Sequence, residues 1–244
     1  MQIPRPGWNW QMQKKNSSSR IEKIIAESLK KQKEQQREFS LFGKFFYLKE
    51  PFLQPINIQS VINEIESTIP IHLFNEVDEI LVGNFEFLSD RSMEAIYKDG
   101  AIYIINQLYT EKDLLENIIH ETSHSLEYSH GQFIYADRKM QSEFLGKRNR
   151  LKHILQSEGY EVDLYDFNNT EYEEEFDIFL YNEIGYLALD NLARGLFVSP
   201  YAVTSLREYW AVGFEDYFIG DREYVQKISP QLFSKIEGVI TYED

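Results

Sequence analysis

The segment "NIIHETSHSLEYSHG", residues 117–131, holds three of the five histidines in the chain. It lies within a predicted helix that runs from Glu111 to about Gly131. Thr110 and Asp113 have the spacing of a capping box, in which side chains satisfy the free N–H groups at a helix start. What packs on each face of this helix therefore decides the fold.

Two of the three histidines share one face of the predicted helix. At about 100° per residue, His120 and His124 lie within about 40° of each other. An apolar stripe lies on the opposite face. The core can therefore be packed without these two histidines, which leaves them available for chemistry. The stripe consists of Leu114, Leu115, Ile118, Ile119 and Leu126.

His120, Glu121 and His124 form the H-E-x-x-H pattern. A spacing of four residues places the two imidazoles one helical turn apart, so that both can bind a single zinc ion. Glu121 lies beside the metal and is positioned to take a proton from a water molecule whose pKa the metal lowers. We therefore expect Zn²⁺ as cofactor, His120 and His124 as ligands and Glu121 as general base.

Zinc needs a third protein ligand, and four residues are candidates. His130 has the spacing of a metzincin ligand, but the glycine that turns the chain in that motif is absent, and on a continued helix His130 would point away. Glu143 follows His124 at a separation that some gluzincins use. Glu183 follows an asparagine, as the third ligand of thermolysin-like gluzincins does. Each is an alternative. Glu208 is the fourth candidate, although Ser205 and Glu208 also fit a capping box.

The segment "EYWAVGF", residues 208–214, extends the pattern. Together with "HETSH", it resembles the zinc peptidase domain of anthrax lethal factor and its relatives, including the secreted Pro-Pro endopeptidases. The resemblance covers about residues 72–240 at low identity and implies a zincin-like fold of the gluzincin class. It implies Glu208 as the third zinc ligand. It also implies that the hydroxyl of Tyr201, seven residues earlier, assists the transition state.

Two features depart from that family. The segment between the two halves of the site is longer, which predicts a helical insertion around residues 140–195. Val212 stands where an acidic residue often follows the ligand by one helical turn. We therefore expect weaker support of the metal site from neighbouring residues.

Strand signals lie early in the chain and helix signals late, which predicts an α+β fold with a small early β-sheet and a mostly helical C-terminal half. Residues 99–100, Asp-Gly, indicate a tight hairpin between two β-rich segments. A short amphipathic helix is expected from residue 58 to Pro70. Residues 41–58, rich in phenylalanine and interrupted by two prolines, are expected to be a linker. Residues 171–197 predict one or two helices.

The chain has a formal net charge of −15, and this charge is unevenly distributed. Residues 1–40 carry nine Lys or Arg against four Asp or Glu, which predicts a basic N-terminal arm with an exposed helix before an acidic domain at 41–244. An acidic domain disfavours nucleic acid as a partner, because phosphate binding needs clustered cations. The sequence has no cysteine, so a metal would be bound by histidine and carboxylate. We expect a cytoplasmic protein without a membrane partner, because neither a signal peptide nor a membrane span is evident.

These patterns favour a zinc metalloendopeptidase acting on a peptide or protein substrate. Residues 95–105, "AIYKDGAIYII", would offer an edge strand on which an extended peptide can lie. The alternative is a structural or assembly protein, for example a phage virion component, that keeps a zincin fold with or without activity. Its motivation is the leader "MQIPRPGWNWQMQKK", whose two Trp and two Pro suit binding to a protein partner.

Overall fold

The computed structural model describes residues 37–89 and 93–242. The chain divides into two compact units, residues 1–39 and residues 40–244. The expected basic arm with its exposed helix, residues 1–40, lies outside the described residues apart from 37–40. Among the helices of the described residues, none is both long enough and apolar enough to cross a membrane. The protein has an α+β fold with a small mixed sheet.

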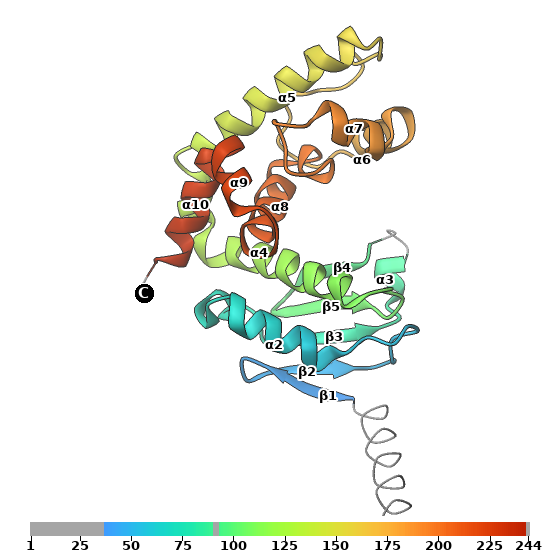
Figure 1. The fold of residues 1–244 in the computed structure, drawn as a ribbon, viewed down its shortest axis with the longest axis vertical. Coiled ribbons are helices and arrows are strands. Elements are labelled where there is room, and N and C mark those ends of the chain that lie inside the picture. Colours follow the sequence, from blue (N-terminus) through green and yellow to red (C-terminus); the bar gives the residue numbers. More distant parts are fainter. Residues whose placement is uncertain (1–36, 90–92, 243–244) are drawn as a thin grey trace, which may run out of the picture. The chain divides into compact units, whose positions relative to one another are not determined.

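The described strands form one five-stranded sheet in the order β1-β2-β3-β5-β4 (Figure 1). Strands β2, β3 and β5 run parallel, whereas β4 pairs antiparallel with β5 and lies at the edge. The first two strands correct the expected linker at 41–58, because a hairpin occupies the first half of that segment. The strands are β1 (Glu38–Leu41), β2 (Lys44–Leu48), β3 (Glu79–Gly83), β4 (Ala95–Lys98) and β5 (Ala101–Ile105).

The expected Asp-Gly hairpin is confirmed between β4 and β5. Asp99 and Gly100 have φ angles of 52° and 85°. Two consecutive residues with positive φ form the turn whose twist matches that of antiparallel strands, and Gly adopts this conformation without a steric cost. The turn sets the register in which Ala95 faces Ile104 and Tyr97 faces Ile102.

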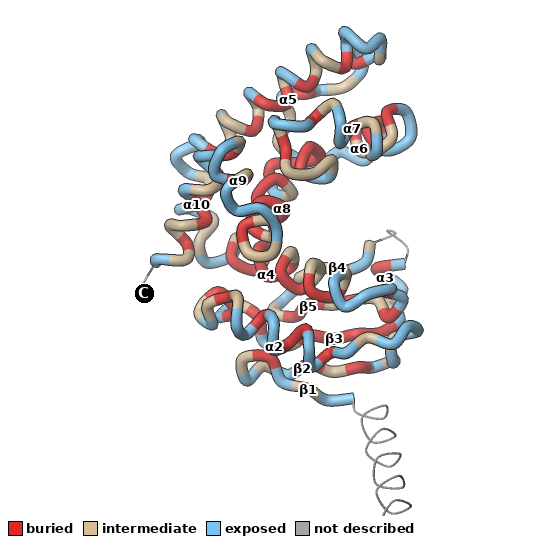
Figure 2. The backbone as a smooth tube through the Cα atoms, viewed as in Figure 1, coloured by how far each residue is buried: buried red, intermediate tan, exposed pale blue. Residues whose placement is uncertain are grey.

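Helices α2 (Ile58–Thr68) and α4 (Glu111–Tyr135) cover one face of the sheet (Figure 1). The predicted capping box of α4 is present, because Thr110 and Asp113 each bond the other's backbone N–H. Figure 2 shows buried residues on β3, β5 and α4, where the sheet meets the helix. The predicted apolar stripe of α4 is confirmed as core, since its members are at most 6% exposed: Leu114, Leu115, Ile118, Ile119 and Leu126.

The C-terminal half is helical, as expected, and residues 171–197 are helical as their pattern predicts, although the helices are short and irregular. They form two short helices joined by a π-helical segment at Phe179–Ile184. Gly185, with φ 79°, ends that segment and begins the next helix. The helices of this half are α5 (Lys139–Ser157), α6 (Glu174–Ile178), α7 (Tyr186–Leu192), α8 (Leu206–Ile219), α9 (Arg222–Ile228) and α10 (Pro230–Ile240).

Helix α8 packs against α4 at the level of the H-E-x-x-H pattern. Trp210 is fully buried, and its indole N–H donates a hydrogen bond to the carbonyl oxygen of Ser123 at 3.0 Å. At the start of α8, the Ser205 hydroxyl accepts a hydrogen bond from the Glu208 N–H at 3.1 Å. The serine therefore caps the helix, and the Glu208 carboxylate is available to face α4.

Candidate metal centre

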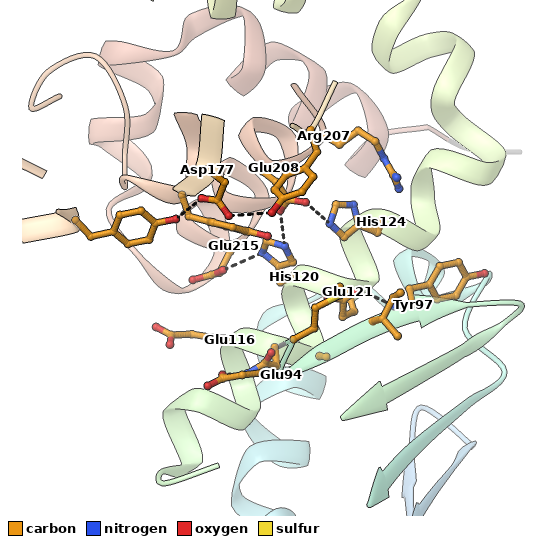
Figure 3. Close-up of a pocket in the computed structure, with 17 residues that line it drawn as sticks. Glu94, Tyr97, Glu116, His120, Glu121, His124, Asp177, Arg207, Glu208 and Glu215 are labelled. Atoms are coloured by element: carbon orange, nitrogen blue, oxygen red, sulfur yellow. Dashed lines mark hydrogen bonds and ion pairs between the residues drawn. The ribbon is translucent and has the colours of Figure 1, made fainter. Parts of the chain in front are cut away.

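Three side chains from two helices converge between α4 and α8 (Figure 3). His120 and His124 come from α4, and Glu208 comes from the first turn of α8. One potential ligand atom from each residue lies within 4.8 Å of those of the other two, so this group could hold a metal ion. The structure brings together the three residues that the sequence and the resemblance pointed to, although His120 and Glu208 are 88 residues apart in the chain.

The two imidazoles present the same ring nitrogen to the glutamate. The Nε2 atom of His120 lies 3.0 Å from Oε2 of Glu208. The Nε2 atom of His124 lies 3.7 Å from Oε1 of the same carboxylate. Each of these side chains is at most 16% exposed. The nitrogens and carboxylate oxygens therefore point into one common space, as ligands of a single ion must.

The other ring nitrogen of each histidine contacts a second carboxylate. Nδ1 of His124 lies 2.7 Å from Oε1 of Glu127, and Nδ1 of His120 lies 3.4 Å from Oε2 of Glu215. A carboxylate at Nδ1 fixes the ring orientation and makes Nε2 the free lone-pair donor, an arrangement that is general for histidine ligands of metals. Both rings are thus oriented for coordination through Nε2.

Glu215 is relevant to Val212, which stands where an acidic residue often occurs in the family that the sequence resembles. The sequence predicted weaker support because an acidic residue is absent one helical turn after Glu208. In the structure a carboxylate reaches His120 from two turns after Glu208, since Glu215 lies seven residues further along the same face of α8. The carboxylate contact that Val212 cannot make is therefore made to His120 by Glu215.

Electrostatics at the site favour positive charge on the imidazoles. Burial alone would lower the pKa of His120, but hydrogen bonds to Glu208 and Glu215 outweigh it and raise the pKa to about 10. Burial also opposes protonation of His124, and its bonds to Glu127 and Glu208 raise the pKa to about 9. Burial would raise the pKa of Glu208, yet its bonds to the two imidazoles dominate and lower it. The surrounding carboxylates thus favour positive charge on the two imidazoles at neutral pH.

Glu121 lies beside His120 and His124 and points toward the edge of the sheet (Figure 3). Its side chain is buried, with 7% of the residue exposed. One carboxylate oxygen, Oε2, accepts a hydrogen bond from the Tyr97 N–H of β4 at 2.6 Å (Figure 3). The predicted general base therefore lines the same cavity as the histidines and is held by the edge strand.

Tyr201 also lines this cavity. Its ring centroid is 6.2 Å from that of His120. Burial, followed by the charge of Glu208, raises the pKa of Tyr201, so its hydroxyl keeps the proton that it would donate. Two other tyrosines that line the cavity, Tyr172 and Tyr186, donate their hydroxyls to Asp177 at 3.0 Å. Of these three tyrosines, Tyr201 is the one whose proton is not committed to Asp177.

The alternative ligands lie elsewhere. His130 is on α4, which continues to Tyr135 without the turn that a metzincin ligand needs, and its Nδ1 contacts the Ser129 hydroxyl at 2.8 Å. Glu183 is exposed and accepts a hydrogen bond from the Tyr165 hydroxyl at 3.2 Å. Neither side chain lines the cavity of the candidate metal centre.

The Glu143 carboxylate, the remaining alternative, is occupied by hydrogen bonds that connect helices. Its carboxylate accepts hydrogen bonds from the Tyr209 hydroxyl and from the Gln231 N–H, each at 2.9 Å, and from the Leu232 N–H at 3.2 Å. It thereby satisfies two N–H groups at the start of α10, which begins at Pro230. Glu143 connects α5, α8 and α10 on a different side of α8.

The cavity that contains the site measures about 690 Å³. Residues 93–97 form one wall, α4 and α8 form the floor, and residues of the 172–186 segment form the opposite wall. The segment around 140–195, which the sequence predicts as a helical insertion, thus contributes side chains to the cavity. Six of the lining side chains are carboxylates: Glu94, Glu116, Glu121, Asp177, Glu208 and Glu215.

Sequence reasoning missed three residues of the site. Glu127 and Glu215 hold the imidazoles, and the Arg207 Nε donates to Oε2 of Glu127 at 2.7 Å. Helical spacing offered a signal for the first, because Glu127 follows His124 by three residues on the same face. Glu215 follows Glu208 by seven residues on the same face of α8, but its contact with His120 depends on how α8 packs on α4, as does that of Arg207 with Glu127.

Comparison with models of protein families finds no match, and none of the curated proteins matches the chain.

Proposed function

We propose that this chain is a zinc-dependent peptidase built on a zincin-like domain of the gluzincin class. The proposal rests on the two imidazole Nε2 atoms and one carboxylate that converge in a cavity containing a further buried glutamate. Two nitrogens and one carboxylate suit zinc, whereas magnesium and calcium prefer oxygen ligands alone. A zinc ion held by His120, His124 and Glu208 would supply a Lewis acid that lowers the pKa of water and polarises a carbonyl.

The chain's own residues divide the remaining work. Glu121 accepts a proton from the attacking water and passes it to the leaving amine. The Tyr201 hydroxyl donates a hydrogen bond to the oxygen on which negative charge develops. Glu127 and Glu215 keep the imidazoles in the orientation that directs Nε2 inward. The edge of β4, which forms one wall of the cavity, accommodates the substrate as an extended segment.

The assembly alternative has a different basis. Its motivation is the leader of the chain, which lies outside the described residues. It stays an expectation from the sequence, and the contacts of the described residues give the stronger support to catalysis.

Metal analysis of purified variants tests the ligand set. The wild type is expected to bind one equivalent of zinc, and His120→Ala and Glu208→Ala are expected to lose it. His130→Ala and Glu183→Ala are matched controls, because each removes a side chain of the same type that lies outside the cavity. Retention of zinc by Glu208→Ala as tightly as by Glu183→Ala would contradict the proposed ligand set.

Cleavage of a peptide library, read by mass spectrometry, tests the catalytic roles. Glu121→Gln is expected to keep zinc and lose cleavage, because an amide cannot accept the proton of the attacking water. Tyr201→Phe is expected to keep zinc and substrate affinity and to lower kcat by about 10²-fold. A Glu121→Gln variant that cuts at the wild-type rate would remove Glu121 as the base.

A further inference from the structure

The outer edge of β4 directs the backbone N–H and C=O groups of two residues toward the cavity. The Ile105 N–H donates to the Glu94 carbonyl at 2.8 Å, in register with the pairs of the β4–β5 ladder. Antiparallel pairs alternate between bonded and non-bonded, so Glu94 bonds β5 and the next residue, Ala95, does not. The backbone N–H and C=O groups of Ala95 and Tyr97 therefore point away from β5, toward the free edge that lines the cavity.

The Glu121 carboxylate already accepts a hydrogen bond from one of these groups, the Tyr97 N–H. The distance from the Tyr97 N to Oε2 of Glu121 is 2.6 Å, short for a hydrogen bond to a backbone amide. The carboxylate comes from α4 rather than from a neighbouring strand. It takes the position that a backbone carbonyl of an added strand would take. The other outward groups, the N–H and C=O of Ala95 and the C=O of Tyr97, face the same edge.

We propose that an extended peptide and the Glu121 carboxylate compete for the Tyr97 N–H, and that binding of the peptide releases Glu121 into the cavity. This inference rests on the proposed function, because it concerns how the substrate of that site engages the base. A carbonyl of the bound segment accepts the Tyr97 N–H, and Glu121 loses its partner on the strand. The freed oxygen then faces the space that His120 and His124 line.

The competition defines the kind of substrate. The outward groups of Ala95 and Tyr97 are two residues apart, which is about 7 Å along a strand. Paired antiparallel to β4, a segment must be extended over at least three residues to bond both, so a dipeptide or a small amide bonds one at most. Such short ligands gain fewer bonds to the strand and compete less well with Glu121 for the Tyr97 N–H. The cavity therefore selects extended chain segments, and the base is released when one of them has paired with β4.

Two substitutions of Glu121 distinguish the effect of its hydrogen bond with the Tyr97 N–H from the effect of losing the base. Both Glu121→Gln and Glu121→Ala remove the carboxylate. The glutamine side chain keeps a carbonyl oxygen that can accept the Tyr97 N–H, whereas alanine leaves this group free. The two variants therefore differ in competition for Tyr97 and are equally unable to act as a base.

The first measurement is amide hydrogen exchange of the isolated protein by NMR, which needs neither metal nor ligand. The Tyr97 amide is expected to exchange about tenfold faster in Glu121→Ala than in the wild type, and to stay protected in Glu121→Gln. The Ile105 amide, which bonds Glu94 within the ladder, is the internal control and is expected to be unchanged. Equal Tyr97 exchange in the two variants would overturn the proposed bond.

The second measurement is ligand affinity of the zinc-loaded variants. The probes are tri-alanine peptides that carry a zinc-chelating hydroxamate. One probe carries it at the C-terminus, and the other carries it at the N-terminus through a malonyl group, so that the peptide extends to either side of the metal. Acetohydroxamate, which has no peptide arm, is the matched control. Glu121→Ala is expected to bind at least one peptidyl probe about fivefold more tightly than Glu121→Gln, while both variants bind acetohydroxamate equally.

The outcomes distinguish the two proposals. Equal affinity of both variants for each peptidyl probe, with normal binding of acetohydroxamate, overturns the competition and leaves the metal centre intact. Failure of the zinc-loaded protein to bind acetohydroxamate at all overturns the metal centre and, with it, the inference built on that centre.

Discussion

The contact between His120 and Glu215 leads to a quantitative prediction about zinc affinity. Replacing Glu215 by alanine removes the carboxylate that faces Nδ1 of His120 at 3.4 Å. Loss of such a partner typically costs ten- to a hundredfold in metal affinity, because the ring is no longer held in orientation and becomes a weaker base. We expect Glu215→Ala to weaken zinc binding about tenfold, at the lower end of this range, because the contact is long.

The same geometry predicts the order of two variants. The contact from His124 to Glu127 is 2.7 Å, shorter by 0.7 Å than the contact from His120 to Glu215. Glu127→Ala should therefore weaken zinc binding more, by about a hundredfold. Glu215→Gln should stay within about threefold of the wild type, because its amide oxygen can still accept the Nδ1–H hydrogen bond.

Competition for zinc with a chromogenic chelator at constant pH and salt measures these affinities. Glu116→Ala is the control, because Glu116 also lines the cavity but pairs with Lys112 at 2.7 Å. It therefore reports the loss of one negative charge without the loss of a partner on a ligand. If Glu215→Ala weakens zinc binding no more than Glu116→Ala, Glu215 acts by charge alone, and the assigned role in orienting His120 is wrong.

Three further predictions concern stability and proton linkage. Burial lowers the pKa of Lys147 to about 8, below its unfolded value of 10.5, so the unfolded chain binds more protons between these pH values and the free energy of unfolding rises with pH there. Urea unfolding at pH 7.5 and 10 should show that Lys147→Met lacks about 2 kcal/mol of this rise. Gly213→Ala should lower the free energy of unfolding by about 1–3 kcal/mol, since the added Cβ would collide with the buried side chain of Leu232. Zinc binding at pH 7.5 should release about two protons from His120 and His124, measurable as a calorimetric enthalpy that changes with the ionisation enthalpy of the buffer.

The histidine helix was predictable because its signals are local. The capping box at Thr110 and the apolar stripe are statements about residues three or four apart, and both are confirmed. Glu208 differs, because its local pattern with Ser205 equally indicated a helix cap. In the structure the serine alone caps α8, and the burial of Trp210 against α4 directs the Glu208 carboxylate to His120. Local sequence could not decide between these roles, since the outcome depends on packing between two helices.

The linker expected at 41–58 was wrong for its first half, and the physical reason can be identified. The hairpin between β1 and β2 turns at Phe42 and Gly43, with φ angles of 52° and 80°. A phenylalanine at positive φ is uncommon, so "FG" is not the turn signal that "DG" is at residues 99–100. Tertiary contacts compensate for it. The Phe42 N–H donates to the Glu66 carboxylate at 2.8 Å, and its ring packs on Phe74 with centroids 5.1 Å apart.

The charges around the two ligand histidines explain how one arrangement can suit both the metal-free and the metal-bound protein. Glu208 contacts both imidazoles, and Glu127 and Glu215 each contact one. Without a metal, the raised pKa values keep both rings protonated at neutral pH, and two positive charges lie among these carboxylates. A divalent ion replaces those two protons with the same total charge, so the carboxylates need not move apart or be neutralised. If the site binds zinc as proposed, protons and the metal ion are therefore alternative occupants of the same two Nε2 atoms.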